Sequence, residues 1–220
     1  MFKEIEILDA AGLDALRRIA ASAPFVDGRI SNPHNLAKQN LQLHEPAAYK
    51  KSAEIVLRAL TASEEFRNFT FPASIAPPLL TRYEPGMRYG GHADAAYIQL
   101  TNGLLRSDIS CTVFLSDPDS YEGGALRITL GTRDLRFRCA PGTAIVYPSD
   151  TLHEVEPVTK GERLVAITFI QSRIKDTFRR QILYELNEIA ALEGLTMRAE
   201  NFTRLQLVQQ QLYRHWGEKP

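Results

Sequence analysis

The sequence predicts an α+β protein in which helices flank a β-rich core on both sides. Apolar residues recur at helical spacing before residue 70 and again after Ile174. Between them, residues 78–171 contain short β-rich runs separated by turn residues. Many short strands with such turns favour a sandwich, jelly roll or barrel. The 220 residues are enough for one sizeable core with a small appendage.

Two helices and a short third one are expected before the core. In residues 9–22 the apolar residues follow the period of an amphipathic helix, and Asp9 is suited to cap its start. Residues 45–62 show the same period, with Pro46 suited to the first turn. Residues 63–69 are expected to form the third, short helix.

The core is expected to consist of β-rich runs bounded by clusters of turn residues, such as Ala140-Pro141-Gly142. The expected strands are residues 78–83, 107–116, 124–130, 134–139, 142–147 and 163–171. These runs supply the apolar interior against which the N-terminal helices are expected to pack.

The chain is expected to become helical again after the core. Residues 175–193 and 199–216 carry apolar residues at helical spacing. We therefore expect one domain over residues 1–174 and a C-terminal helical extension over residues 175–220. The apolar faces of the last two helices could pack on the core or on a second subunit, which leaves a homodimer open.

The charge balance and the N-terminus argue against some functions. Lys+Arg and Asp+Glu both total 26, so the basic excess of a duplex-binding protein is missing and no nucleic acid is expected as a partner. The segment MFKEIEILDA has acidic residues where a secretion signal needs basic ones, and no run is long enough to span a bilayer. We expect no membrane partner and a cytoplasmic location. Cys111 and Cys139 lie in strand-like runs without CxxC spacing, as buried reduced thiols do.

A candidate metal site is formed by His92, Asp94 and the distant His153. Two imidazoles and one carboxylate are the facial triad of non-haem Fe(II) oxygenases, which leaves coordination positions open on one side of the metal. On an extended segment, the single residue between His92 and Asp94 puts both side chains on the same face. The alternative is a surface pair with His153 as an ordinary turn histidine. His34, His44 and His215 have no partner pattern and are not expected to be ligands.

Arg163 and Tyr83 are the candidates for binding a carboxylate beside that metal. Arg163 opens an apolar run ten residues after His153, and we expect it to begin a neighbouring strand with its side chain pointing inward. A buried guanidinium needs an anionic partner. In this reaction class the partner is the distal carboxylate of 2-oxoglutarate, to which the Tyr83 hydroxyl could also donate. The alternatives are a surface arginine paired with Glu162 or solvent, and a tyrosine that only fills the rim.

Several long segments resemble the bacterial PKHD-type hydroxylases, which are Fe(II)- and 2-oxoglutarate-dependent dioxygenases related to prolyl 4-hydroxylases. The matching segments are LLTRYEPGMRYGGHAD (79–94), RSDISCTVFLSDPDSYEGGALRI (106–128), APGTAIVYPSDTLHEVEPVTKGERLVAITFIQSRIKD (140–176) and RRQILYEL (179–186). The resemblance covers roughly residues 75–217, and its catalytic segment is about 75–174.

The resemblance implies a double-stranded β-helix core, which is a jelly roll of the cupin kind. It implies Fe(II) on His92, Asp94 and His153, and 2-oxoglutarate on Arg163 and Tyr83. It also implies dioxygen as a partner, L-ascorbate as an accessory reductant and a link to iron homeostasis. The expected reaction is hydroxylation of a peptidyl prolyl or lysyl residue or of a small molecule, with 2-oxoglutarate decarboxylated to succinate and CO2.

One residue departs from the family pattern. Ala125 stands where the family commonly has Glu in a Gly-Gly-Glu-Leu sequence, which alters substrate contacts but no expected metal ligand. Asp94 itself favours hydroxylation, because a halogenase of this superfamily leaves that position vacant for halide. Another class of function also stays open, an iron- or 2-oxoglutarate-responsive binding protein with little turnover.

Overall fold

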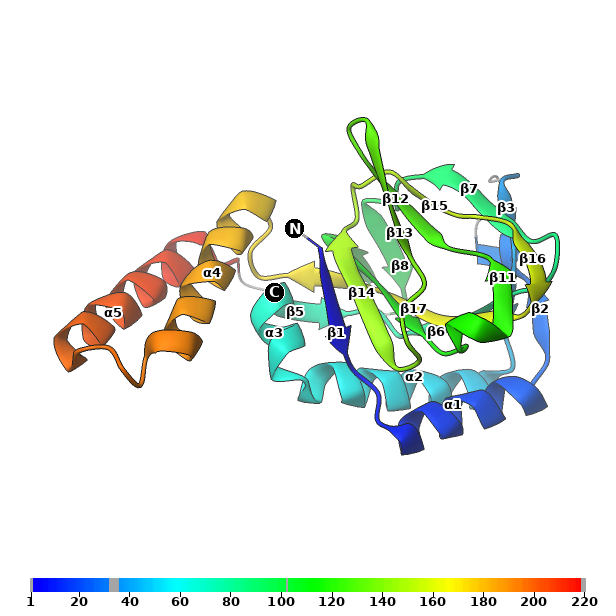
Figure 1. Cartoon of the computed structure of the whole chain (residues 1–220), viewed down its shortest axis with the longest axis horizontal. Helices are drawn as coiled ribbons and strands as arrows, with labels where there is room; N and C mark the ends of the chain where they lie inside the picture. The colour runs from blue at the N-terminus through cyan, green and yellow to red at the C-terminus, as the bar shows by residue number, and fades with distance from the viewer. Residues whose placement is uncertain (1, 32–35, 102, 219–220) are drawn as a thin grey trace.

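Two antiparallel sheets face each other and form a jelly-roll core, as the computed structural model shows for residues 2–31, 36–101 and 103–218 (Figure 1). The strands of the larger sheet are β1 (Lys3–Glu6), β2 (Phe25–Asp27), β4 (Leu41–Leu43), β5 (Pro72–Ile75), β6 (Leu79–Tyr83), β10 (Ile109–Phe114), β14 (Thr143–Pro148) and β17 (Arg163–Ser172). Their order is β1-β14-β10-β17-β6-β4-β2, with β5 paired to β17. The predicted α+β class with a double-stranded β-helix core is confirmed.

The smaller sheet lies opposite and carries the two histidines of the candidate site. Its strands are β3 (Lys38–Gln39), β7 (Arg88–His92), β12 (Leu126–Leu130), β13 (Arg133–Phe137) and β15 (His153–Val155). They are arranged in the order β13-β12-β15-β7-β3. Two ribbons complete the β structure, β8 (Tyr97–Leu100) with β9 (Gly103–Arg106) and β11 (Tyr121–Gly123) with β16 (Val158–Gly161).

Three helices cover the outer face of the larger sheet: α1 (Ala10–Ser22), α2 (Pro46–Ala62) and α3 (Glu64–Thr70) (Figure 1). Asp9 caps α1 by accepting from the Gly12 amide, as predicted, and Glu45 and Ser63 cap the other two helices in the same way. The buried residues that join these helices to the sheet include Leu16, Val56, Leu60, Phe66, Leu80, Val113 and Ala166. A second cluster, which includes Phe114, Leu126, Ile145, Val155 and Val165, fills the space between the sheets.

The six expected strands correspond to β6, β10, β12, β13, β14 and β17, with ends shifted by a few residues. The sequence did not predict the N-terminal strands β1, β2, β3 and β4. They have only two to four residues each, so their local pattern is weak, and they are determined by pairing: β1 with β14, β2 with β4, β3 with β7 and β4 with β6. The N-terminal part therefore adds strands to both sheets as well as helices.

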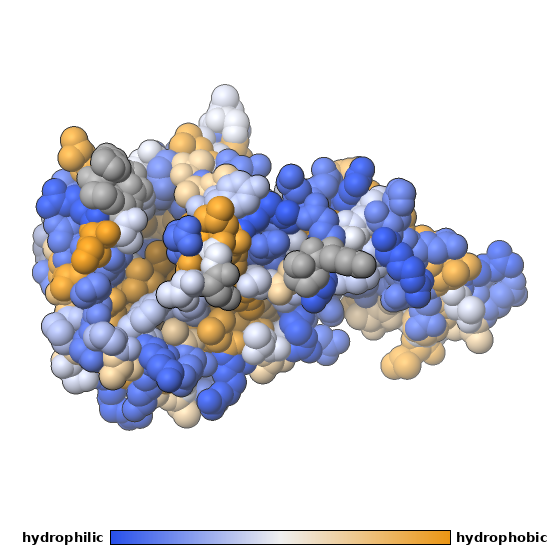
Figure 2. Space-filling model, turned by 180° about the vertical axis from the view of Figure 1, so that it is seen from behind, coloured by the Kyte–Doolittle hydropathy of each residue, from blue (hydrophilic) through white to orange (hydrophobic). Residues whose placement is uncertain are grey.

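The last two helices, α4 (Thr177–Glu193) and α5 (Ala199–Trp216), form a hairpin that projects from the core (Figure 1). The first half of α4 packs on the core, where the ring of Tyr184 meets Phe69 edge-on at 5.2 Å, and Tyr213 near the end of α5 lies against Phe71 with ring centroids 6.0 Å apart. No described residue of α5 is fully buried. Figure 2 shows hydrophobic residues on this projecting lobe as well as on the core; the exposed ones are Phe178, Ile189, Leu192, Leu195, Leu207 and Val208. None of the described helices combines the length and the apolar character that a membrane span requires.

Candidate iron and 2-oxoglutarate site

The structure brings His92, Asp94 and His153 together at one end of the space between the sheets. His92 is the last residue of β7, Asp94 follows two residues later, and His153 is the first residue of β15. One ligand atom from each residue lies within 4.8 Å of the others. The Nε2 atoms of His92 and His153 lie 3.8 and 3.6 Å from the two carboxylate oxygens of Asp94.

Both imidazoles are oriented by main-chain carbonyl groups. The Nδ1 atom of His92 lies 2.8 Å from the carbonyl oxygen of Gly90, and that of His153 lies 2.9 Å from the carbonyl oxygen of Thr151. A carbonyl oxygen only accepts, so each Nδ1 must carry the hydrogen and each Nε2 keeps its lone pair. This tautomer directs both lone pairs toward Asp94, and the three residues fit a divalent metal ion with nitrogen and oxygen ligands.

The three side chains are largely shielded from solvent, with exposed fractions of 12% for His92, 13% for Asp94 and 5% for His153. The interpretation as a surface pair is therefore wrong. Burial, and next the neighbouring His153, lower the pKa of His92 below its ordinary value of 6.5. The lowered pKa favours the neutral imidazole, which is the form that binds a metal.

Two tyrosines that the sequence analysis missed hold the imidazole rings in place. The ring of Tyr89 stacks on His92 with centroids 3.7 Å apart, and the ring of Tyr147 meets His153 edge-on at 5.1 Å. Tyrosine is common in β-strands, so the sequence gave no indication that these two residues belong to the site. Tyr147 comes from β14 of the other sheet, whereas Tyr89 lies three residues before His92 on β7, where the pairing with β15 is irregular.

Arg163 lies on the opposite sheet and points into the same interior. It is the first residue of β17, and its side chain is among the largest that are fully buried, with 1% exposure. The interpretation as a surface arginine is therefore wrong. The expectation that its strand neighbours that of His153 is also wrong, because β17 lies in the larger sheet and β15 in the smaller. The two residues face each other across the core, since a jelly roll closes its sheets on each other.

The guanidinium of Arg163 lacks a counter-ion. Among the described residues no carboxylate forms an ion pair with it, and its Nε and Nη2 atoms have no hydrogen-bond partner. Burial lowers the pKa of Arg163, because the charged guanidinium loses its contact with water. An anionic ligand that accepted hydrogen bonds from Nε and Nη2 would offset the free energy of burying the charge.

Tyr83 stands beside Arg163 as its register partner on β6, and the guanidinium carbon lies 5.0 Å from the centre of its ring. Asn40, which the sequence analysis missed, donates from Nδ2 to the Tyr83 hydroxyl oxygen over 3.1 Å. The oxygen therefore accepts from Asn40 and keeps its own hydrogen for another acceptor. Burial raises the pKa of Tyr83, so the hydroxyl stays protonated and can act as that donor.

A cavity of about 50 Å³ connects these groups, and its lining includes Tyr83, His92, Asp94, His153 and Arg163. The metal-binding and the carboxylate-binding candidates thus open into one space. A 2-oxo acid that chelated the metal could extend toward the guanidinium, which is the arrangement a dicarboxylate needs.

The structure explains why the second residue of the Gly-Gly sequence before Ala125, Gly124, is a glycine. It has a φ of +61°, and a Cβ there would lie 2.8 Å from Val158 Cγ2 and 3.1 Å from Arg163 Cδ. Glycine is therefore required both by the backbone conformation and by the contact with the stem of Arg163. Ala125 itself is 5% exposed.

The remaining histidines do not join the site. His44 and His215 are exposed, and the one group of potential metal ligands in the described residues consists of His92, Asp94 and His153. His34 lies outside the described residues.

Comparison with known proteins identifies the family of this chain. The family model of the 2OG-Fe(II) oxygenase superfamily matches residues 78–171. A PKHD-type hydroxylase of Sphingopyxis alaskensis is 63% identical over 216 residues, which cover 98% of this chain and 99% of that protein. The chain belongs to the PKHD-type hydroxylase family. This hydroxylase is accordingly a 2-oxoglutarate-dependent, non-haem iron dioxygenase, and the predicted resemblance is confirmed.

Solved structures share the fold of this hydroxylase. A prolyl-4-hydroxylase of Pseudomonas putida aligns with a TM-score of 0.55 and 19% identity, covering 78% of this chain and 92% of that one. A viral collagen prolyl hydroxylase of Paramecium Bursaria Chlorella virus-1, solved as a 2OG complex, aligns with a TM-score of 0.52 and 19% identity, covering 78% and 96%. At this identity the likeness establishes the jelly-roll architecture.

Proposed function

We propose that His92, Asp94 and His153 hold Fe(II), while Arg163 and Tyr83 bind the distal carboxylate of 2-oxoglutarate. The observation that carries the proposal is the buried Arg163, which has no counter-ion among the described residues and lines the same cavity as the three candidate ligands. An uncompensated buried charge is costly, so such a residue is expected to have an anionic ligand. Two imidazoles and a carboxylate are the ligands that a non-haem Fe(II) oxygenase uses.

When bound, Fe(II) and 2-oxoglutarate supply the oxidising chemistry: dioxygen gives one atom to succinate, formed with CO2 from 2-oxoglutarate, and one to a substrate C–H bond that becomes C–OH. The protein orients the participants. The Nε2 atoms of His92 and His153, with the carboxylate of Asp94, would hold the metal, and a triad of this kind leaves positions for the 2-oxo acid and dioxygen.

Side chains around the triad restrict access of water. Tyr89 covers one face of His92, and Tyr147 packs on the edge of His153. The apolar residues Leu126, Val155 and Ile167 line the same cavity. A shielded interior keeps the oxidant from side reactions and directs it to the bound substrate.

Asp94 supports hydroxylation over halogenation, because its carboxylate occupies the position that a halide would need. For the substrate we propose a peptidyl prolyl or lysyl residue or a small molecule. The peptide option is favoured by the prolyl hydroxylases among the solved structures with the same fold. L-Ascorbate as accessory reductant and a role in iron homeostasis are proposed from the family.

We further propose that residues 1–174 form the oxygenase domain and residues 175–220 the C-terminal extension. The projecting hairpin of α4 and α5 supports this division. The hydrophobic residues on that hairpin are compatible with a homodimer. A cytoplasmic location is supported by Cys111 and Cys139, which are both buried free thiols, as predicted.

The test is succinate formation by the purified protein with Fe(II), 2-oxoglutarate and dioxygen, with and without peptide and metabolite mixtures. We expect succinate to increase when a substrate is present, with one product that gains one oxygen atom by mass spectrometry. His153→Ala should form none, and His44→Ala, which changes an exposed histidine, should behave as the wild type. Tight Fe(II) binding without succinate under any condition would favour the binding-protein alternative.

A further inference from the structure

A chain of three buried serines leads to the carboxylate of Asp94. Ser110 Oγ donates to Asp94 Oδ2 over 2.5 Å, and it lies 2.8 Å from Ser149 Oγ. Ser107 Oγ donates in turn to Ser149 Oγ over 2.8 Å. We propose that this chain positions Asp94 so that Oδ2 is held by Ser110 and Oδ1 is left to bind the metal. The inference rests on the proposed function of Asp94 as an Fe(II) ligand.

The direction of the hydrogen bonds in this chain follows from the chemistry of its members. An ionised carboxylate only accepts, so the one hydrogen of Ser110 goes to Asp94. Ser110 must then accept from Ser149, and Ser149, whose hydrogen is used, must accept from Ser107. All donors therefore point toward Asp94. Aligned hydrogen bonds polarise one another, and this strengthens the hydrogen bond from Ser110 to the Asp94 carboxylate.

The serines sit where water does not compete. Ser107, Ser110 and Ser149 are 8%, 3% and 2% exposed. Ser110 is the second residue of β10, and Ser149 follows directly after β14. The carbonyl oxygen of Ser149 also accepts from the backbone amide of Asp94 over 3.1 Å. Ser149 thus holds the main chain of Asp94 directly and its side chain through Ser110.

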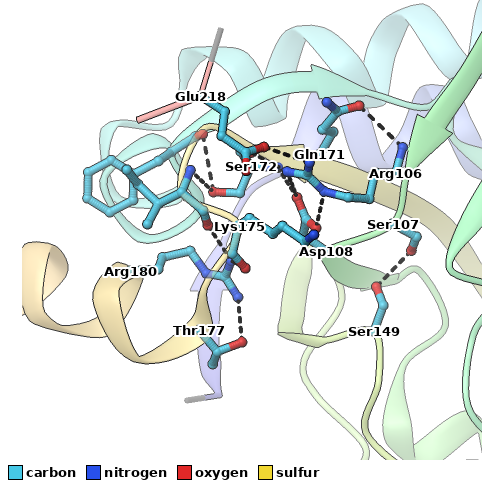
Figure 3. A network of polar contacts seen from close by, with 12 residues as sticks. Arg106, Ser107, Asp108, Ser149, Gln171, Ser172, Lys175, Thr177, Arg180 and Glu218 are labelled. Carbon is cyan, nitrogen blue, oxygen red and sulfur yellow. Dashed lines mark hydrogen bonds and ion pairs between the residues drawn. The ribbon is translucent and has the colours of Figure 1, made fainter. Parts of the chain in front are cut away.

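The far end of the chain is anchored in a network of charged groups (Figure 3). Ser107 lies between Arg106 and Asp108, whose side chains are joined by two hydrogen bonds of 2.7 and 3.0 Å. The Asp108 carboxylate also accepts from the amide of Ser172 at the end of β17, and Arg106 donates to Glu218 over 2.6 Å. These bonds fix the segment that carries Ser107, so the first donor has a defined position.

The hydrogen bond from Ser110 affects how many coordination positions of the metal Asp94 would occupy. A carboxylate that binds through both oxygens takes one position more than a carboxylate that binds through one. A 2-oxo acid that chelates needs two open positions and dioxygen needs one. A hydrogen bond of 2.5 Å to Oδ2 holds the carboxylate in one rotation and competes with the metal for that oxygen. Ser110 is therefore a positioning residue that acts through Asp94.

The test compares four variants with the wild type in the absence of oxygen. Ser110→Ala removes the donor to Asp94, Ser110→Thr keeps a hydroxyl, and Ser107→Ala removes only the far end. Ser52→Ala is the matched control, because Ser52 is also buried, at 1% exposed, but its hydroxyl donates to the carbonyl of Tyr49 on its own helix. Fe(II) affinity is measured by competition with a chelator, and 2-oxoglutarate is titrated by the visible absorption of the ternary complex.

We expect Ser110→Ala to weaken Fe(II) binding about 10- to 100-fold, which is the usual effect of losing a group that holds a metal ligand. At saturating Fe(II) its titration with 2-oxoglutarate should also move to higher concentration, since a carboxylate free to bind through both oxygens takes a chelating position. Ser107→Ala should show a smaller loss, and Ser110→Thr and Ser52→Ala should match the wild type. These two readouts need no turnover.

Wild-type values for Ser110→Ala in both titrations would overturn the inference while leaving the proposed function intact. A wild-type protein that binds no Fe(II) would overturn both this inference and the proposed function. If Ser110→Ala does not unfold cooperatively in urea, Ser149→Ala takes its place, because it removes the donor to Ser110 and leaves Ser110 unchanged. Fe(II) affinity equal to that of the wild type in a folded Ser149→Ala protein would likewise contradict the inference.

Discussion

His92 on β7 and His153 on β15 lie directly opposite each other in the smaller sheet, with their ring centroids 4.3 Å apart. Side chains of directly opposed residues in antiparallel strands project from the same face of the sheet. The pairing of these two strands therefore converts a long sequence separation into a pair of adjacent nitrogen ligands. Asp94 reaches the pair because it follows His92 by two residues.

Removal of one imidazole should abolish metal binding. In His153→Ala the pair loses one nitrogen, so we expect Fe(II) affinity to fall by more than the roughly 10- to 100-fold that changes around the ligands cause. The weak visible band of anaerobic Fe(II) with 2-oxoglutarate should disappear. His215→Ala, which changes an exposed histidine on α5, is the control and should keep the band. A band of normal intensity in His153→Ala would exclude His153 as a ligand.

Arg163→Met tests the carboxylate site while keeping most of the side-chain volume. Loss of one partner of a buried charge pair costs about 2 kcal/mol or more, so 2-oxoglutarate should bind roughly 30-fold or more weakly. Fe(II) affinity should change little. The apo protein should unfold at the same or a higher urea concentration, because an uncompensated buried charge is removed.

The matched ligand for this variant is 2-oxobutanoate, which chelates a metal but has no distal carboxylate. It should bind the wild type and Arg163→Met equally in the anaerobic titration. An equal loss of affinity for both 2-oxo acids would mean that Arg163 acts on the metal or on folding, and not on the distal carboxylate.

Gly124→Ala should affect 2-oxoglutarate binding through the position of Arg163. Its new methyl group would press on Arg163 Cδ and Val158 Cγ2. Gly131→Ala is a close control, because Gly131 has nearly the same φ, +60° against +61°, but a Cβ there meets nothing within 4 Å. Gly131→Ala should lose about 1 kcal/mol of stability from the strained backbone, and Gly124→Ala should lose more because of the added contacts. Only Gly124→Ala should shift the 2-oxoglutarate titration, and equal titrations for the two variants would contradict this contact.

The buried thiol of Cys111 should make the protein sensitive to alkali. Burial raises the pKa of Cys111 from an ordinary value of 9.0 to about 12. Between these values the unfolded chain releases the proton and the folded protein keeps it, so stability falls as pH rises. From pH 8 to pH 10 the free energy of unfolding should fall by about 1 kcal/mol more in the wild type than in Cys111→Ala. Urea unfolding at the two pH values measures this difference, and parallel losses in the two proteins would rule it out.

The helices and the candidate metal-binding residues could be predicted because short sequence patterns indicate them. The start of α1 follows from the cap at Asp9 and that of α2 from Pro46 in its first turn, and both helices follow the spacing of their apolar residues. The triad was recognisable because two histidines and an aspartate within β-rich segments belong to few kinds of site. The family resemblance, carried by long segments, added the assignment of Arg163 and Tyr83.

The sequence by itself thus determined the class of the fold, the main helices and strands, and the residues proposed to bind a metal and a carboxylate. Only the tertiary structure decided that Arg163 faces His153 from the other sheet, that Tyr89 stacks on His92, and that Ser110 holds Asp94. The first and third relations depend on strand pairing and sheet closure between separate segments of the chain, and the second depends on the irregular pairing of β7 with β15 between Tyr89 and His92. No local pattern encodes such contacts, because an extended strand has the same appearance whichever strand it pairs with.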